Sequence, residues 1–145
     1  MTELMSIRAA TPQDAPMTAA IKSAWIDDSD WLTRLKSRDE IEQSHRDRLI
    51  PNHEVHVIGT PVAGYIALDD ENFVTSLFCE PQGAGLGRAM LDHAKARRPY
   101  LQLWSFEANT GACRFYEREG FVQVGRAEDE SEEKLPDILY RWEAA

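Results

Sequence analysis

The chain of 145 residues is long enough to bury one sizeable hydrophobic core. Hydrophobic residues make up 43% and charged residues 28%, which excludes collagen-like, low-complexity and largely disordered proteins. Lys and Arg number 16 against 25 Asp and Glu, and the resulting net charge of −9 repels phosphate backbones and anionic membranes. We therefore expect one domain over residues 1–145, with neither nucleic acid nor a membrane as its partner.

Cysteine content and the N-terminal residues indicate a cytoplasmic protein. Cys79 and Cys113 are the only cysteines and form no C-x-x-C pair, which fits a reducing compartment. The first residues lack the basic start and apolar stretch of an export signal, and no window holds 18 consecutive apolar residues. The acidic balance favours a cationic substrate, although it is also a common way of keeping a protein soluble.

The first part of the chain predicts one strand and two helices. Apolar and polar residues alternate in residues 5–9, and helical spacing follows over residues 12–27 until a polar run. Ser37 and Glu40 have the spacing of a capping box, which places the start of a second helix there. We expect this helix to end at Pro51, because a proline interrupts helical hydrogen bonding.

The rest of the chain reads as strands with two further helices, which gives an α/β fold (α+β mixed sheet). Three strand-like runs joined by short turns predict an antiparallel unit at residues 53–58, 62–68 and 73–79. A glycine-rich turn, an amphipathic helix and the strand 100–106 then form a crossover, so the strands flanking this helix should be parallel. Asn109 can cap the next helix, Gly120 can end it, and closing strands follow at 121–124 and 138–142.

The glycine-rich turn between strand and helix has the chemistry of an anion site. It reads Gln82-Gly83-Ala84-Gly85-Leu86-Gly87-Arg88. Small residues let backbone N–H groups converge, and the helix start adds its positive dipole end, which together suit a pyrophosphate. The turn is neither a P-loop nor a dinucleotide G-x-G-x-x-G motif. Taken alone, such a turn is structural about as often as it is functional.

A second pattern lies one strand later and reads Asn109-x-x-Ala112-x-x-Phe115-Tyr116-Glu117-x-x-Gly120-Phe121. With both patterns in this order, the chain resembles the GNAT superfamily of acyl-CoA-dependent N-acyltransferases. The pyrophosphate loop of that family reads Q/R-x-x-G-x-G/A, which Gln82, Gly85 and Gly87 match. In one departure, Pro81 directly precedes Gln82, whereas family members commonly have a few residues between them. The resemblance covers nearly the whole chain and is firmest for residues 73–124.

The resemblance implies acetyl-CoA as a cosubstrate, with pantetheine lying between the splayed fourth and fifth strands. A backbone N–H near Phe78 or Cys79 would polarise the thioester carbonyl. Tyr116 would donate a proton to the leaving CoA thiolate, or else it is only a tyrosine at the edge of the core. The cofactor-binding residues that the resemblance implies are Leu77, Phe78, Cys79, Gln82, Gly83, Ala84, Gly85, Leu86, Gly87, Arg88, Asn109 and Phe115.

The general base is not evident from the sequence. No carboxylate lies in residues 73–79, so the base would come from elsewhere in the chain. Glu107, Asp69, Asp70 and His56 are possible sources, although each can equally be a surface or hairpin residue. Cys79 could in principle carry the acyl group, but a small strand residue is the simpler interpretation.

The histidines show no ligand spacing for a metal, and we predict none. The four are His45, His53, His56 and His93. The function we expect is transfer of an acetyl group to a primary amine by direct attack in a ternary complex. The acceptor would be a small cationic amine such as a polyamine, an amino sugar or a lysine-like side chain. The alternative is a non-catalytic acyl-CoA-binding sensor or subunit, and the chain could form a homodimer.

Overall fold

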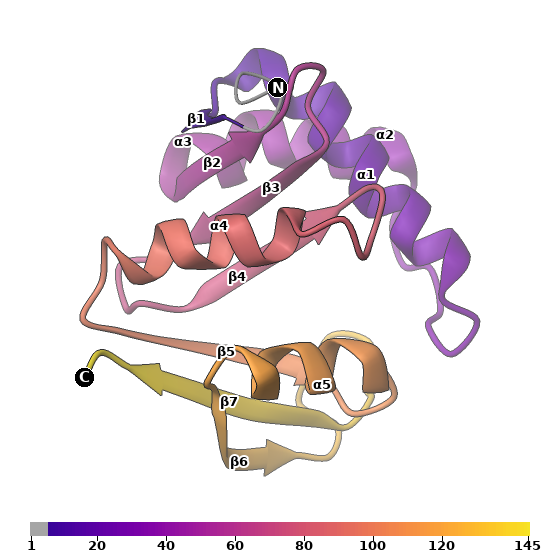
Figure 1. Ribbon diagram of the computed structural model, residues 1–145. Helices are drawn as coiled ribbons and strands as arrows, with labels where there is room; N and C mark the ends of the chain where they lie inside the picture. Colours follow the sequence, from indigo (N-terminus) through magenta and orange to yellow (C-terminus); the bar gives the residue numbers. More distant parts are fainter. Residues whose placement is uncertain (1–5) are drawn as a thin grey trace.

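The computed structural model describes residues 6–145, which form two sheets with helices packed on them (Figure 1). The predicted first strand begins at Ile7, and its expected start at Met5 lies outside the described residues. The elements are β1 (Ile7–Ala9), η2 (Pro12–Asp14), α1 (Ala15–Asp28), α2 (Arg38–Ser44), η3 (His45–Leu49), α3 (Ile50–Asn52), β2 (Glu54–Ile58), β3 (Gly64–Leu68), β4 (Val74–Cys79), α4 (Leu86–Lys95), β5 (Tyr100–Phe106), α5 (Thr110–Arg118), β6 (Val122–Ala127) and β7 (Asp137–Glu143).

Both sheets are antiparallel within themselves. The first has the order β1-β2-β3-β4, with each strand paired to its neighbour in sequence. The second has the order β5-β7-β6, so the last strand of the chain lies between β5 and β6. The predicted α/β fold with a mixed sheet and three consecutive antiparallel strands is therefore confirmed.

The two sheets meet at one parallel bridge between β4 and β5. Phe73, just before β4, pairs with Gln102 of β5, and the Gln102 N–H donates to the Asn72 carbonyl at 3.0 Å. No ladder joins the two strands beyond this point in residues 6–145, and Figure 1 shows them diverging towards their carboxyl ends. The parallel relation expected from the crossover is confirmed, and the divergence leaves the carboxyl end of β4 with an unpaired edge.

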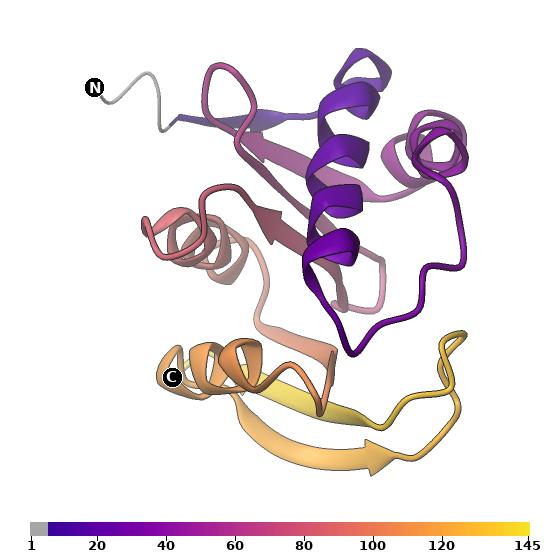
Figure 2. The ribbon, with the colours of Figure 1, turned by 90° about the vertical axis from the view of Figure 1, so that its right-hand side faces the viewer.

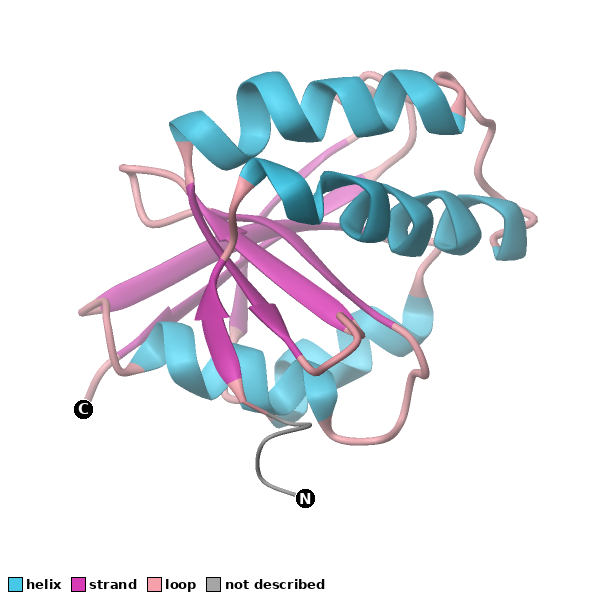
Figure 3. Cartoon of the chain, turned by 90° about the horizontal axis from the view of Figure 1, so that it is seen from above, coloured by secondary structure: helices cyan, strands magenta, loops and turns pink. Residues whose placement is uncertain are grey.

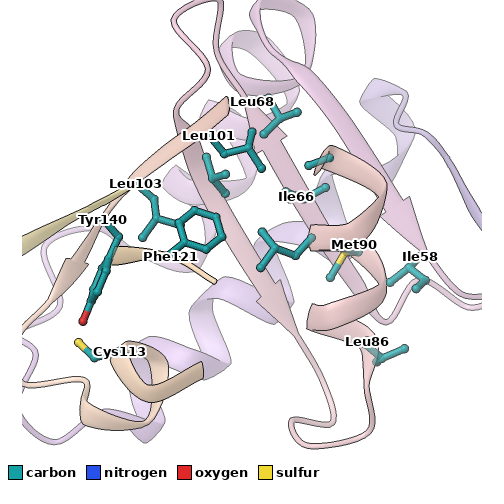
Figure 4. Packing of buried hydrophobic residues seen from close by; sticks show 13 residues of the cluster. Ile58, Ile66, Leu68, Leu86, Met90, Leu101, Leu103, Cys113, Phe121 and Tyr140 are labelled. Carbon is teal, nitrogen blue, oxygen red and sulfur yellow. The ribbon is translucent and has the colours of Figure 1, made fainter. Parts of the chain in front are cut away.

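Strand alternation sends side chains into two hydrophobic layers, because neighbouring residues of a strand point to opposite faces. On β3, Ile66 and Leu68 pack with residues of α4. Tyr65 and Ala67 point to the other face and pack with residues of α1, α3 and β2. Helices therefore lie on both faces of the strands, as the view from above shows (Figure 3). The α4 layer also continues into the second sheet through Leu101, Leu103, Phe121 and Tyr140 (Figure 4).

The second helix continues past Pro51, so the expected end at this residue is wrong. Its start is as predicted, because the Glu40 N–H donates to the Ser37 hydroxyl at 3.1 Å and the Ser37 N–H donates to the Glu40 carboxylate at 2.9 Å. The helix then widens into the π-helical turn η3, in which the Ile50 N–H donates to the His45 carbonyl. Pro51 follows at the start of α3, where a missing N–H and a fixed φ are tolerated.

The cap of α5 is also as predicted. The Asn109 side chain accepts the Ala112 N–H at 3.2 Å, and Gly120 follows the helix with a φ of 94°. Within residues 6–145, none of the helices combines the length and the apolar character that crossing a bilayer requires.

Candidate active site

The glycine turn joins the end of β4 to the first residue of α4. Gly83 and Gly85 have φ values of 81° and 85°, a left-handed conformation that side chains other than glycine rarely adopt. Gly85 is the N-cap of α4, and residues 81–85 are all exposed. The turn therefore presents backbone N–H groups and a helix N-terminus to solvent at one place, which is the arrangement that binds a phosphate.

Close packing at Gly87 brings α4, α5 and the end of β4 together. A Cβ at this position would lie 3.4 Å from Cζ of Phe115 and 4.0 Å from Sγ of Cys79. A larger residue would therefore push α5 away from the turn. Burial raises the pKa of the Cys79 thiol, so this group stays protonated near neutral pH and is a poor acyl carrier.

Tyr116 lies on α5 close to this junction. Its ring packs against those of Phe115, Phe121 and Tyr140, with centroids 5.3, 5.8 and 6.2 Å away. Burial, and then the neighbouring thiols of Cys113 and Cys79, raise the pKa of the Tyr116 phenol above its ordinary value. In the part of the chain that is described, its hydroxyl has no hydrogen-bond partner. A protonated phenol is thus held near the end of β4 with its donor unused.

The free edge of β4 carries unpaired backbone groups. The Glu80 N–H donates to the Ala63 carbonyl at 2.8 Å, which directs this N–H towards the neighbouring strand β3. Alternation along a strand then turns the N–H groups of Leu77 and Cys79 towards β5, where the two strands have separated. An extended ligand could hydrogen-bond there as an added strand does.

Aromatic side chains gather at the end of β4 on the face that packs against α1, opposite the face that packs against α4. Phe78 contacts the Trp25 ring at a centroid distance of 4.8 Å, and Trp25 lies 6.0 Å from Trp31. Trp31 in turn packs edge-on against Phe106 at 5.4 Å. The end of α1, the loop after it, β4 and β5 are therefore joined by one aromatic cluster.

A pocket of about 360 Å³ opens beside this cluster. Its lining combines two indole rings, two carboxylates and three uncharged polar side chains: Trp25, Asp28, Ser29, Trp31, Glu80, Gln82 and Asn109. Aromatic faces and carboxylates both attract cations. Gln82 and Asn109, which the sequence assigned to the cofactor, thus also line a pocket suited to a positively charged group.

The base candidates from the sequence lie away from this pocket's lining. Glu107 accepts a hydrogen bond from Arg126 at 2.6 Å, and Asp69 accepts the backbone N–H groups of Glu71 and Phe73 in the β3–β4 turn. His56 is hydrogen-bonded to the Glu54 carboxylate at 2.9 Å on β2. Exposed Asp70 belongs to the same β3–β4 turn as Asp69.

Sequence reasoning missed Glu80 and Asp28 as possible site carboxylates. Glu80 directly follows the fourth strand, and Asp28 is the last residue of α1. Their positions at element ends were the available signal. Only the packing of α1 beside β4 shows that they line one pocket with Trp25 and Trp31.

The remaining predicted cofactor residues differ in how they could act. Leu86 is 5% exposed and belongs to the core, so only its backbone is available to a ligand. Ala84 is exposed in the turn, and Leu77 is partly buried against the core. The Arg88 side chain is 71% exposed and lies 3.9 Å from Asp92 and 3.8 Å from Glu119.

Metal ligands are not grouped in the described chain. Residues 6–145 contain no cluster of three or more His, Cys, Asp or Glu side chains able to hold a metal ion. His56 of β2 and His93 of α4 have ring centroids 4.6 Å apart. His45 lies elsewhere and shares a hydrogen bond of 2.8 Å with the Thr18 hydroxyl. His53 precedes β2 at the end of α3.

A splayed pair of parallel strands, a glycine turn at a helix N-terminus and a protonated tyrosine lie together around the end of β4. The sequence matches the family described as "Acetyltransferase (GNAT) domain" over residues 32–143. The chain therefore belongs to the GNAT acetyltransferase family, as its motifs predicted, and is an acetyltransferase.

Individual relatives agree with this assignment. The chain is 29% identical over 82 residues to peptidyl-lysine N-acetyltransferase YiaC of Escherichia coli, in a match that spans about half of each protein, 54% of this chain and 55% of the other. It is 29% identical over 131 residues to peptidyl-lysine N-acetyltransferase YjaB of Salmonella typhimurium, covering 86% and 88% of the two chains. The solution structure of apo YjaB from Escherichia coli superposes with a TM-score of 0.79 at 27% identity, covering 97% and 99%.

Proposed function

We propose that this protein transfers the acetyl group of acetyl-CoA to the primary amine of a cationic acceptor, by direct attack in a ternary complex. The observation that carries the proposal is the arrangement around the end of β4. A pocket with carboxylates and indoles lies on one face, and Tyr116 lies towards the other. The pocket carboxylates could then take a proton from the entering amine, while Tyr116 could donate a proton to the leaving thiolate.

The cofactor would occupy the turn and the open strand edge. Its pyrophosphate would accept hydrogen bonds from backbone N–H groups of residues 83–88, at the start of α4. Its pantetheine would follow the free edge of β4, with the Cys79 N–H aimed at the thioester oxygen. Because these contacts are made by backbone, they depend on strand geometry more than on side-chain identity.

The acceptor would be held as a cation and must react as a neutral amine. A lysine-type amine has a pKa of about 10.4 in solution, so its proton must be removed near neutral pH. Glu80 follows the strand proposed to hold the thioester and lines the pocket, so we assign it as the proton acceptor, directly or through water. The amine lone pair then attacks the carbonyl carbon, and collapse of the tetrahedral intermediate breaks the C–S bond while the thiolate takes the Tyr116 proton. The attacking nitrogen loses its remaining extra proton to water, and water returns a proton to the Tyr116 phenolate.

One further observation supports the proposed acceptor, and another supports the proposed compartment. Both curated relatives are named for acetyl transfer to peptidyl-lysine, which is a cationic primary amine. Cys79 and Cys113 are both free, which supports a reducing compartment such as the cytoplasm.

An acceptor panel tests this function. The protein is incubated with acetyl-CoA and Nα-acetyl-lysine amide, a lysine peptide, spermidine, glucosamine or a neutral amine, and CoA release and product mass are measured. We expect turnover with cationic amines and roughly 10²–10⁴-fold slower turnover for Glu80→Gln at neutral pH. Glu107→Gln, which removes a carboxylate paired with Arg126, is the matched control and should keep the wild-type rate. CoA binding with no release for any amine would instead identify a non-catalytic sensor.

A further inference from the structure

A second hollow lies on the face of the β5-β7-β6 sheet that α5 leaves uncovered. In Figure 2, α5 lies on one side of these strands and the β6–β7 loop extends beside the other elements. The hollow measures about 370 Å³ and is lined by Trp104, Ala127, Glu130, Ser131 and Asp137. It is separate from the lining of the pocket at the β4 end and uses none of the residues assigned to acetyl transfer.

Small residues on β6 and an exposed indole on β5 create this hollow. Gly125 pairs with Leu139, and a Cβ at Gly125 would lie 3.5 Å from the Leu139 side chain. Ala127, two residues further, also has little side-chain volume. Trp104 pairs with Leu139 from the other side and is 45% exposed, although an indole ring has much to gain from burial. The lining therefore resembles a binding surface with one aromatic wall.

Asp137 gives the hollow its charge. The residue is only 8% exposed, and in residues 6–145 its carboxylate has neither an ion pair nor a hydrogen bond. Burial, and then the negative charge of Glu133, raise the pKa of this carboxyl above its ordinary value. A largely buried carboxylate without a partner in the protein favours a cation beside it, and its oxygens remain open to the hollow. A cationic group entering the hollow would supply the missing partner, with Glu130 and the Trp104 ring beside it.

Phe106 connects the hollow to the acceptor pocket, although it lines neither of them. Phe106 is the strand partner of Asp137, and the Phe106 ring packs against Trp31, which lines that pocket. A ligand that reaches both sites would therefore carry two positive groups, one for each cavity.

We propose that this hollow binds a second basic side chain of a lysine-containing polypeptide acceptor, and so selects lysines with a neighbouring Lys or Arg. The inference rests on the proposed function, because it assumes that the acceptor lysine enters the pocket at the β4 end. Val122 and Val124, on the same strand as Ala127, are 61% and 53% exposed and offer apolar contact to further residues of a polypeptide. A second copy of this chain would bring like charges together, since the residues around the hollow are acidic.

Equilibrium binding and turnover test the proposal separately. Peptides carrying one acceptor lysine and a Lys or Arg at each of the two positions on either side are compared with peptides that have Gln there. Binding is measured calorimetrically with CoA present, which holds the donor site without any acetyl group to transfer. We expect roughly tenfold to hundredfold tighter binding of a basic-flanked peptide, the scale of a charge-assisted hydrogen bond.

The Asp137→Asn variant should remove that preference and leave kcat/KM for Nα-acetyl-lysine amide unchanged. Asp129→Asn, in the same loop but outside the lining, is the matched control and should keep the preference. Because Asp137→Asn removes an unpaired buried charge, its thermal melting temperature should not fall, and Trp104→Leu offers a second test of the same site. Preference for a flanking charge that survives Asp137→Asn would overturn the proposal.

The other outcomes are equally decisive. A wild-type protein without any flank preference, Asp137-dependent preference for spermidine over peptides, or a change in oligomeric state caused by Asp137→Asn would each show that the hollow does not recognise a polypeptide. Asp137-dependent peptide binding without acetylation of any acceptor would support this site and contradict the proposed function instead.

Discussion

Tyr116 illustrates how surroundings decide the role of a single side chain. Packed among Phe115, Phe121 and Tyr140, its ring would be an ordinary part of the core. The nearby Tyr140 is such a core residue, and its hydroxyl is already occupied because it donates to the Glu117 carboxylate at 2.7 Å. The Tyr116 hydroxyl has no such partner in residues 6–145, and its raised pKa keeps the proton on the oxygen. This difference between two tyrosines of one cluster favours Tyr116 as the proton donor.

Replacing Tyr116 with Phe should lower kcat by roughly 10²–10⁴-fold while CoA affinity is unchanged, since the donor is lost and the ring is kept. Because the pKa is raised, wild-type rates should show no loss from Tyr116 ionisation up to a pH of about 10, the ordinary value for a phenol. Steady-state rates across pH and CoA titration measure both. Tyr140→Phe is the control: it removes the hydrogen bond to Glu117, so it should lower the melting temperature and leave kcat close to the wild-type value. If the Tyr116→Phe variant kept wild-type turnover at every pH, water and not Tyr116 would be the proton donor to the CoA thiolate.

At the scale of elements, the joint between β4 and α4 depends on backbone conformation more than on side chains. Gly85 caps α4 with a φ of 85°, and Gly87 allows Phe115 of α5 to lie against the turn. Pro81 directly precedes Gln82, so the loop is shorter than in the family pattern. The turn still presents exposed residues 81–85 at the start of the helix, so the shorter connection retains the features of an anion site.

The Gly85→Asp variant should bind CoA much more weakly, because a carboxylate would stand where the pyrophosphate is proposed to lie. Any side chain at this φ also strains the backbone by about 1 kcal/mol, and Gly85→Asn isolates that effect at matched size. Calorimetric titration with CoA at low and high salt measures the difference between the two variants, which should shrink as salt screens the charge. Equal CoA affinities for the two folded variants would place the pyrophosphate elsewhere.

At the scale of the whole molecule, a net charge of −9 should draw cationic acceptors to the protein. Burial lowers the pKa of the Lys22 ammonium on α1, and the negative charges of Glu133 and Glu132 partly offset this effect. The acidic β6–β7 loop therefore lies close to α1. The loop thus adds negative charge near the end of α1, whose last turn contributes Trp25 and Asp28 to the acceptor pocket.

Steering of this kind is tested by the double variant Glu132→Gln/Glu133→Gln, which leaves the lining of both cavities unchanged. At low salt its kcat/KM for a cationic acceptor should be several-fold below wild type, and added salt should bring the wild-type value towards it. Asp70→Asn/Glu71→Gln removes the same charge from the β3–β4 turn at the other end of β4 and should have little effect. A salt-independent deficit would mean that the loop acts by contact instead of by its long-range field.

The sequence by itself determined the order of elements, the family and the position of the glycine turn. Hydrophobic period, turn residues and caps are local properties, so the capping box at Ser37, the Asn109 cap and the parallel relation of β4 and β5 could all be predicted. The end of the second helix was wrong because a proline is tolerated after a π-helical turn, which depends on how that segment packs.

Only the tertiary structure decided which distant side chains share a site. Asp28 and Glu80 are separated in sequence by the helical elements α2, η3 and α3 and by three strands, yet they line one pocket because α1 packs beside β4. Asp137 lies at the start of a predicted strand, where nothing local marks it as a buried carboxylate without a partner. Its environment arises when β7 inserts between β5 and β6, and strand order is set by burial across the whole sheet, which no short window of sequence records.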